Sequence, residues 1–184
     1  MPDLTAARAL LHEWTETESL RRHAEAVAAS MGGMARRMNG DEGLWRATGL
    51  LHDMDYERHP TPEAHPYVGV EELERLGYPE AMRAAILGHA PYTGVARETD
   101  LARALFAVDE LSGFVVACAW VRPTRLDGLT PRSVKKKLKD KRFAAAVSRE
   151  DIRQGAAEVG MELDGLIALV IESLQGEAET LGLA

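Results

Sequence analysis

Apolar residues recur with the period of an α-helix along almost the whole chain, and no stretch alternates polar and apolar residues as a half-buried strand does. Ala, Leu, Glu, Arg and Met dominate, and these residues favour helices. The length of 184 residues matches one domain, since ~100–200 residues per domain is usual. We therefore expect an all-α single domain over residues 1–184.

Capping residues and helix breakers indicate where these helices begin and end. Thr15 or Thr17 can cap the second helix, and Thr15 with Glu18 has the spacing of a capping box. Residues 55–64 contain two prolines and are expected to form a loop. The expected helices cover residues 4–14, 18 to at least 31, 41–51, 66–76, 79–89, 99–120, 131–138, 148–159 and 163–176.

Charge and cysteine content exclude several classes of protein. The net charge is −7, from 22 Lys and Arg against 29 Asp and Glu, which argues against a protein that coats nucleic acid. The single cysteine, Cys118, excludes an internal disulfide framework and a cysteine-rich zinc site, and its apolar neighbours place it in the core. The longest apolar run, residues 114–121, is too short for a membrane span, and no signal peptide is recognisable at Met1. A cytoplasmic location is therefore expected.

Asp109 is the most unusual residue in this pattern. It follows Leu105, Phe106 and Val108 in an apolar stretch of the long helix at residues 99–120. Burying an unpaired carboxylate costs several kcal/mol or more, so Asp109 needs a cation. The sequence offers no obvious arginine on the same helix face, and a divalent metal ion would serve instead.

Four histidines and a second aspartate also occupy helix ends or inward helix faces. His23 lies on the apolar stripe of its helix, His52 and Asp53 directly follow an apolar helix, and His89 ends another. His65 precedes a proline and is expected at a helix N-terminus, where the helix dipole keeps the imidazole neutral, as a metal ligand must be. Nitrogen and carboxylate ligands without thiolate suit Fe, Mn, Co, Ni or a catalytic Zn ion.

A simpler interpretation exists for each of these residues alone. A single histidine on an apolar face is more often a hydrogen-bonded core residue than a metal ligand. Six candidate ligands are harder to explain in this way. His59 is a rival to His65, because a proline follows it too, but we favour His65 because a helix begins directly behind it. We interpret His12 and His59 as surface residues.

A lone histidine, a His-Asp doublet and a distant aspartate, in this order, resemble the HD superfamily of metal-dependent phosphohydrolases. The matching residues are His23, His52 with Asp53 in the phrase Gly-Leu-Leu-His-Asp, and Asp109. The core resemblance covers about residues 18–120 and leaves a C-terminal helical extension at about 121–184. Over nearly its whole length the chain is also similar to a group of bacterial HD proteins whose substrate is unassigned.

The resemblance implies a bundle of five or more helices around a centre with one or two divalent metal ions. His65 and His89 resemble the extended six-ligand set of binuclear members. One ion would take His23, His52, Asp53 and Asp109, and a second would take His65, His89 and the shared Asp53. The implied activity is hydrolysis of a phosphomonoester or phosphodiester in a small phosphorylated metabolite, expected to be a nucleotide, by a metal-activated hydroxide at His52 and Asp53. A di-iron oxygenase and a metal-containing regulatory module without turnover remain alternatives.

Further residues outside the six complete the expected site. We place Asp55 in the catalytic set, where it could orient the water or a ligand histidine, although it could equally be a solvated loop acid. Arg122 follows the helix that carries Asp109 and is expected to contact the substrate phosphate. Residues 132–142 contain seven basic side chains that either steer an anionic ligand or form a solvated helix face. The family resemblance and the apolar C-terminal third favour a homodimer.

Overall fold

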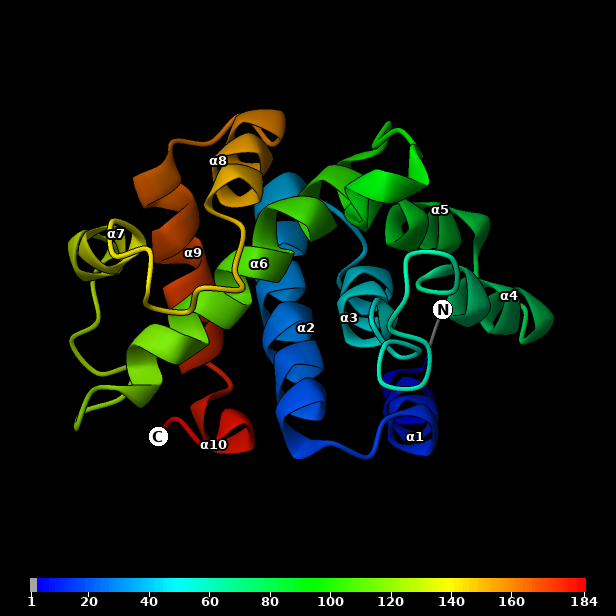
Figure 1. The fold of residues 1–184 in the computed structure, drawn as a ribbon, viewed down its shortest axis with the longest axis horizontal. Coiled ribbons are helices and arrows are strands. Elements are labelled where there is room, and N and C mark those ends of the chain that lie inside the picture. The colour runs from blue at the N-terminus through cyan, green and yellow to red at the C-terminus, as the bar shows by residue number, and fades with distance from the viewer. Residues whose placement is uncertain (1–2) are drawn as a thin grey trace.

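The computed structural model describes residues 3–184 and is all-α, as the sequence predicts (Figure 1). Within these residues there are ten α-helices, one short 3-10 helix and no β-strand. Residues 1 and 2 of the expected domain lie outside the described part. The elements are α1 (Leu4–Trp14), α2 (Glu18–Met38), α3 (Glu42–Leu51), α4 (Tyr67–Arg75), α5 (Glu80–His89), η1 (Pro91–Thr93), α6 (Asp100–Trp120), α7 (Pro131–Leu138), α8 (Arg149–Glu158), α9 (Leu163–Gln175) and α10 (Ala178–Leu181).

Most helices begin and end where the sequence predicts. Asp41 caps α3 and Thr99 caps α6, each by accepting a backbone N–H of the first helical turn. The predicted loop at residues 55–64 contains turns and no helix. Helices α4 and α5 begin one residue later than predicted, because Pro66 and Pro79 occupy the N-cap positions.

The predicted capping box of Thr15 and Glu18 is wrong. Thr17 is the N-cap of α2, and its side chain makes no capping hydrogen bond. Thr15 is buried, and its hydroxyl donates to the carbonyl of Met54 at 3.1 Å. The carboxylate of Glu57 accepts the backbone N–H of Thr17 at 3.1 Å. The loop after α3 therefore holds the start of α2, through tertiary contacts that local spacing does not reveal.

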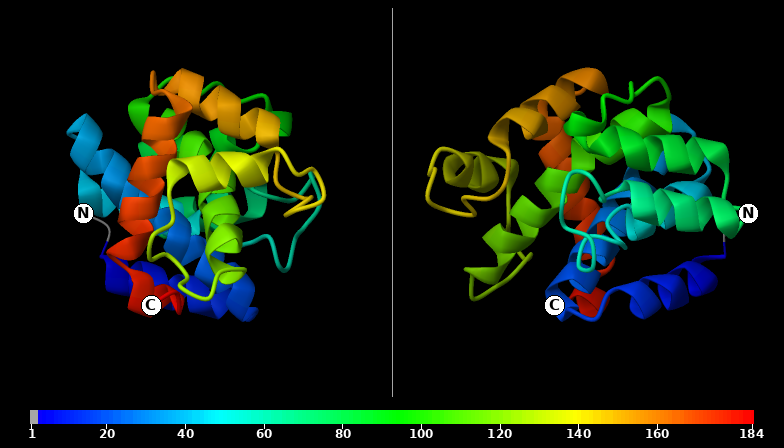
Figure 2. Two further views of the ribbon diagram at one scale, coloured as in Figure 1. Left: turned by 90° about the vertical axis from the view of Figure 1, so that its left-hand side faces the viewer. Right: turned by 45° about the vertical axis from the view of Figure 1, so that its right-hand side comes forward.

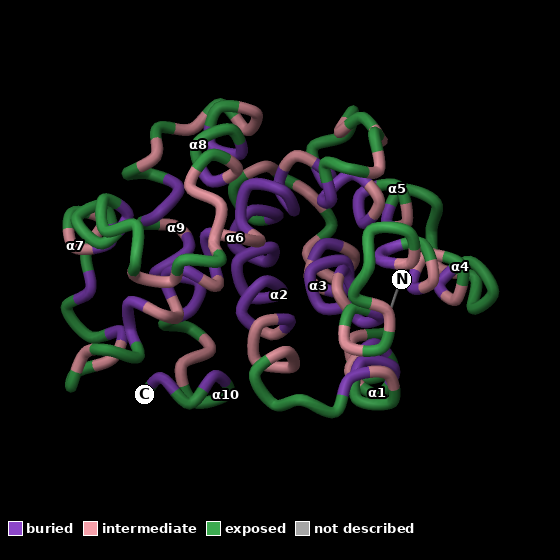
Figure 3. The backbone as a smooth tube through the Cα atoms, viewed as in Figure 1, coloured by how far each residue is buried: buried purple, intermediate pink, exposed green. Residues whose placement is uncertain are grey.

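Helix α2 is the central element of the fold (Figure 1). Almost every residue between Ala24 and Ala35 is buried, because α3, α6 and α9 pack around this helix. Figure 3 shows the burial along α2 and the exposure of α7 at the periphery. The two views in Figure 2 show α8 and α9 folding back along α6 and α2. His23 therefore belongs to an element that most of the molecule surrounds.

Close contacts fix the position of α6, the helix that carries Asp109. The hydroxyl of Ser112 donates to the hydroxyl of Ser30 at 2.8 Å and joins α6 to α2 in the buried interior. Helix α8 crosses α6 at Gly155, where an added Cβ would lie 2.5 Å from the Cα of Ala107. Glycine is required for this approach, which brings the N-terminal turn of α8 beside the same part of α6.

The segment after α6 extends the same hydrophobic core. Leu166, Ile167 and Val170 of α9 are buried with residues of α2 and α6. Cys118 is buried in α6, and burial raises the pKa of its thiol to about 11. Across residues 3–184, none of the helices combines the length and the apolar character that crossing a bilayer requires.

We predict that Gly155→Ala lowers the free energy of unfolding by about 1–3 kcal/mol, because the added methyl group forces α6 and α8 apart. Urea unfolding followed by circular dichroism measures the change. Gly165→Ala in α9 is the matched control, because an added Cβ there meets only the end of Met161 at 3.8 Å. Because alanine has a higher helix propensity than glycine, Gly165→Ala should stabilise the protein by roughly 0.5–1 kcal/mol. Equal effects of the two substitutions would contradict the tight crossing.

Candidate metal centre

Five separate segments of the chain bring six side chains to one centre. These are the residues that the sequence predicts as metal ligands, and all of them come together. Most lie at a helix end, where a side chain can project past the last turn into the space between helices. They are His23 of α2, His52 and Asp53 directly after α3, His65 before α4, His89 at the end of α5, and Asp109 of α6.

Asp53 lies in the middle of the cluster, and its two carboxylate oxygens face different histidines. Oδ1 lies 3.2 Å from Nε2 of His89 and 3.3 Å from Nε2 of His65. Oδ2 lies 3.4 Å from Nε2 of His52 and 4.0 Å from Nε2 of His23. The carboxylate therefore joins two pairs of imidazoles that come from four different segments.

Asp109 completes the half of the cluster that contains His23 and His52. Its Oδ1 lies 3.0 Å from Nε2 of His23 and 3.3 Å from Nε2 of His52. The ligand atoms of these three residues lie within 4.8 Å of one another, as do those of His52, Asp53 and His89. Both groups are positioned to hold a metal ion.

Hydrogen bonds to backbone carbonyls on the far side of the rings fix the orientation of two of the histidines. Nδ1 of His52 donates to the carbonyl of Gly49 at 2.7 Å, and Nδ1 of His89 donates to the carbonyl of Ile86. Each acceptor lies three residues earlier, in the last turn of the histidine's own helix. With the proton on Nδ1, the lone pair of Nε2 points into the cluster, which is the tautomer that a metal ligand needs.

His52 shows most directly that these residues fit a metal ion. Its side chain is 0% exposed, and among the described residues Nε2 has no hydrogen-bond partner. A nitrogen lone pair that faces carboxylate oxygens at 3.3–3.4 Å is repelled unless a proton or a metal ion lies between them, and a metal ion can replace that proton. Histidine and carboxylate donors without thiolate are the set that Fe, Mn, Co, Ni and catalytic Zn accept.

Asp55 forms a hydrogen bond with a histidine of the cluster and does not line the cavity. Its side chain is 1% exposed, so the solvated loop acid is excluded. Oδ1 accepts the Nδ1 proton of His65 at 2.7 Å, and Oδ2 accepts the backbone N–H of Gly69 at 2.8 Å. A Cβ at Gly69 would lie 3.0 Å from Cγ of Asp55, so this glycine makes room for the carboxylate. The expectation of a catalytic Asp55 is corrected to a positioning residue for His65.

The electrostatic field of the cluster attracts positive charge. Burial favours the neutral imidazole of His52, but the carboxylates of Asp53 and Asp109 outweigh burial and raise its pKa well above the usual range. At His65, Asp53 and Asp55 likewise overcome burial and raise the pKa to about 9. Burial opposes the charged carboxylates, yet His52 holds the pKa of Asp53 and of Asp109 below the usual range. Both carboxylates therefore remain ionised and available to a cation.

A cavity of about 300 Å³ opens on the cluster. Tyr56 and Tyr92 lie at its exposed edge, and the hydroxyl of Tyr92 donates to the carbonyl of His65 at 3.0 Å. Phe106, Glu110 and Asp151 form another part of its wall. Among the described residues that line this cavity there is no lysine or arginine.

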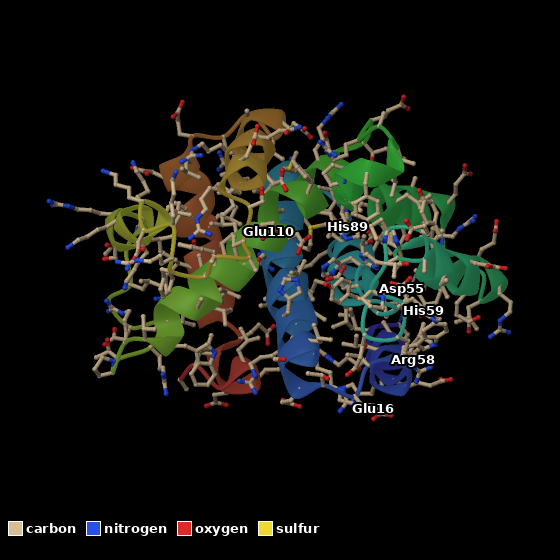
Figure 4. The ribbon with its side chains drawn as sticks, in the orientation of Figure 1. Glu16, Asp55, Arg58, His59, His89 and Glu110 are labelled. Carbon is tan, nitrogen blue, oxygen red and sulfur yellow. The ribbon has the colours of Figure 1, made fainter. Side chains whose placement is uncertain are left out.

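These wall residues were not predicted from the sequence. Glu110 is next to Asp109 in the apolar run and could have been noticed there. It lies on α6, whereas His89 and Asp55 lie to its right in Figure 4. Burial, Asp109 and Asp151 raise the pKa of Glu110 to about 7, and the backbone N–H of Ser148 partly offsets them. Asp151 lacks any local signal, because only the crossing of α8 over α6 brings it to the cavity.

Arg122 does not line this cavity, which corrects the expected phosphate contact. Asp109 lies eleven residues before Trp120, the last residue of α6, and a helix rises ~1.5 Å per residue, so ~16 Å of helix separates Asp109 from the turn that carries Arg122. Its guanidinium donates to the carbonyl of Asp127 at 2.7 Å and to the carbonyl of Arg125 at 3.1 Å. Arg122 therefore closes the turn after α6.

The basic residues 132–142 also lie away from the cluster. Helix α7, which carries four of them, lies at the left of Figure 1, on the other side of α2 from α3 and α5. Val134 and Leu138 turn inward, whereas Lys135 pairs with Asp164 at 2.7 Å on the surface. This placement favours the solvated helix face over a direct contact with the ligand.

The choice between His59 and His65 is clear from the geometry. His65 contacts Asp53 and Asp55 in the cluster, whereas His59 lies on the loop beside Arg58 (Figure 4). His12, which the sequence places on the surface, is exposed.

The fold is a helical bundle in which four histidines and Asp109 surround the carboxylate of Asp53. This fold and cluster define the class of the protein as a metal-binding α-helical domain. The sequence model of the family described as HD domain matches residues 20–113, more than half of the chain, and the matched range contains all six residues of the cluster. The protein belongs to the HD domain family. HD domains bind divalent metals and are generally phosphohydrolases. No curated protein and no solved structure matches the chain.

We predict that His65→Gln weakens the binding of Mn²⁺ or Zn²⁺ by more than the roughly 10–100-fold that loss of an outer-shell partner costs. His59→Gln is the matched control and should leave the affinity unchanged, because His59 lies outside the cluster. Titration calorimetry on the metal-free variants measures both affinities. If His59→Gln has the larger effect, the cluster is assigned to the wrong histidine.

Metal binding should release protons at about pH 7, because the histidines bind a metal ion only as neutral imidazoles. The pKa of His65 is raised to about 9, so its proton is still bound at neutral pH and must leave. The affinity should therefore rise with pH from about 6.5 toward 9. Calorimetry in buffers of different ionisation enthalpy counts the released protons. Binding without proton release would show that the imidazoles are not the ligands.

Proposed function

We propose that this HD protein is a metal-dependent phosphohydrolase that acts on a small phosphorylated metabolite. The observation that carries the proposal is the Asp53 carboxylate, whose two oxygens each face a pair of imidazoles. One of these imidazoles is His52, whose buried Nε2 has no hydrogen-bond partner among the described residues. This geometry supports the ligand sets expected from the family resemblance. One set consists of His23, His52, Asp53 and Asp109, and the other consists of His65, His89 and the second oxygen of Asp53.

When a divalent ion is bound by these residues, it supplies Lewis-acid activation of water and neutralises charge on a phosphoryl group. The chain's own residues hold the geometry in which this chemistry takes place. Asp55 fixes the ring of His65, the last turn of α3 fixes His52, and the last turn of α5 fixes His89. Two of these rings are held by the last turns of α3 and α5 and the third by Asp55, so the site is organised before substrate binds.

The lining of the cavity favours water as the nucleophile. Among the described lining residues there is no serine, threonine, cysteine or lysine that could attack phosphorus. Cys118 is buried in α6 and lines a different hollow, beside Leu129 and Lys136. Hydrolysis by water therefore agrees with the residues at hand, because the histidines, Asp53 and Asp109 of the lining are the proposed metal ligands and are not free nucleophiles.

The substrate is proposed to carry a single phosphate group. A nucleoside di- or triphosphate brings extra negative charges, and the cavity wall offers carboxylates and no lysine or arginine to meet them. Among nucleotides, the class expected from the sequence, this charge favours monophosphates. Tyr56 and Tyr92 provide ring faces at the opening on which a base could stack. A cavity of about 300 Å³ is at the small end of metabolite sites.

The test is release of inorganic phosphate by the metal-loaded protein from a panel of phosphate mono- and diesters. We predict turnover of single-phosphate esters and loss of that activity to background in Asp53→Ala. Asp127→Ala, the same change at an exposed position, should keep the activity. Oxygen consumption without phosphate release would support the di-iron oxygenase instead. An intact ligand that co-purifies and is never turned over would support the regulatory module.

A further inference from the structure

Two carboxylates on the cavity wall lie outside the proposed set of metal ligands. Glu110 is on α6 and Asp151 is in the first turn of α8, and both line the cavity beside the proposed metal ligands. In the part of the chain that the structure describes, neither forms an ion pair with a lysine or arginine within 4.0 Å. Asp109 is next to Glu110 in the chain and adds a further negative charge.

Two arginines lie near this wall, Arg149 in sequence and Arg97 in space, and both are bonded to other groups. Arg97 pairs with Glu158 through two contacts of 2.7 Å and donates to the carbonyl of Gly88 at 2.9 Å. Arg149, two residues before Asp151, donates to backbone carbonyls of the loop at residues 140–147. The backbone N–H of Ser148 offsets part of the charge of Glu110, and Arg97 offsets part of that of Asp151. The lining itself still presents carboxylates and no lysine or arginine inside a small cavity, where solvent screens charge less than at the surface.

Such a wall selects among phosphorylated ligands by charge. It repels an anionic group that lies beside the phosphate, and it stabilises a cationic group in the same place. Phe106 of α6 adds an apolar surface to the lining of the same cavity, which suits methylene groups. The phosphate group of the ligand is proposed to bind to a metal ion held beside the buried and unpartnered Nε2 of His52.

We infer that the preferred substrate is a zwitterionic phosphate ester, with an ammonium group that binds Glu110 and Asp151 and a short alkyl chain between ammonium and phosphate. This inference rests on the proposed phosphohydrolase function and specifies its substrate class. In the reaction, water adds to phosphorus and the bond from phosphorus to the alkyl oxygen breaks. The leaving oxygen takes a proton, so the products are inorganic phosphate and an amino alcohol.

Binding of unreactive phosphonates tests the charge selection without turnover. The probes are 3-aminopropylphosphonate and butylphosphonate, which have the same chain length and differ in the terminal ammonium. Titration calorimetry on the Mn²⁺-loaded protein at about pH 8, where the ammonium and the carboxylates are charged, should give about tenfold tighter binding of the aminopropyl probe. Equal affinities, tighter binding of butylphosphonate, or no measurable binding of either probe overturn the inference.

Substitutions assign the effect to the two carboxylates. In Glu110→Gln with Asp151→Asn, the ratio of the two affinities should fall from about ten to about one. Glu150→Gln is the matched control, because Glu150 is an exposed acid in the same turn of α8 that does not line the cavity. It should keep the wild-type ratio. A ratio that falls equally in the control shows that general charge, and not the wall, selects the ligand.

Hydrolysis separates failure of this inference from failure of the proposed function. The matched esters are 2-aminoethyl phosphate, propyl phosphate and phosphoglycolate, with a cationic, a neutral and an anionic end. We expect kcat/KM to fall in that order, with a preference for the first over the second of about tenfold that disappears in the double variant. Hydrolysis of propyl phosphate, phosphoglycolate or a nucleoside monophosphate at an equal or higher rate overturns the inference and leaves the phosphohydrolase intact. Selective binding without hydrolysis of any ester upholds the ammonium site and overturns the phosphohydrolase.

Discussion

The pairing of one carboxylate with four imidazoles is the interaction on which the arrangement of the helices depends. Asp53 places each oxygen against histidines from different segments, and these contacts form only if α2, α3, α5 and the start of α4 meet at one point. Charged and polar groups in the interior are costly unless they are satisfied. The cluster therefore constrains how the apolar faces of these helices pack, and the surrounding core keeps the ligand atoms a few ångströms apart.

The rigidity of the cluster comes from ordinary backbone features. His52 and His89 each follow a helical turn whose carbonyl, three residues earlier, accepts the Nδ1 proton. His65 has no such turn behind it, and the buried Asp55 takes that part, held in turn by the N–H of Gly69. The loop thereby supplies to His65 the hydrogen bond that a helical turn supplies to His52 and His89. This explains why Asp55 is buried although the residues that follow it, 56–64, are exposed or half-buried.

Local sequence was sufficient to predict nine of the ten α-helices that the structure describes and the six clustered residues, but not the short α10 or the rest of the site. Asp109 could be predicted because a carboxylate in an apolar helix needs a cation, and the histidines because they lie at helix ends or, for His23, on an apolar helix face. Thr15, by contrast, has the spacing of a capping residue but bonds to Met54, and Asp151 reaches the cavity only through the α6–α8 crossing. Arg122 failed as a phosphate ligand because the carbonyls of its own turn hold it. Each failure involves a partner that is distant in sequence or a competing backbone group.

Anomalous diffraction from crystals of the metal-loaded protein tests the central claim most directly. Data collected on both sides of the absorption edge of the metal identify the element and place each ion. We expect an anomalous peak bounded by His23, His52, Asp53 and Asp109, and a second peak on the side of Asp53 that faces His65 and His89. A metal-loaded crystal with no peak in contact with Asp53, or with its ions bound at other residues, would contradict the claim that this carboxylate organises a metal centre.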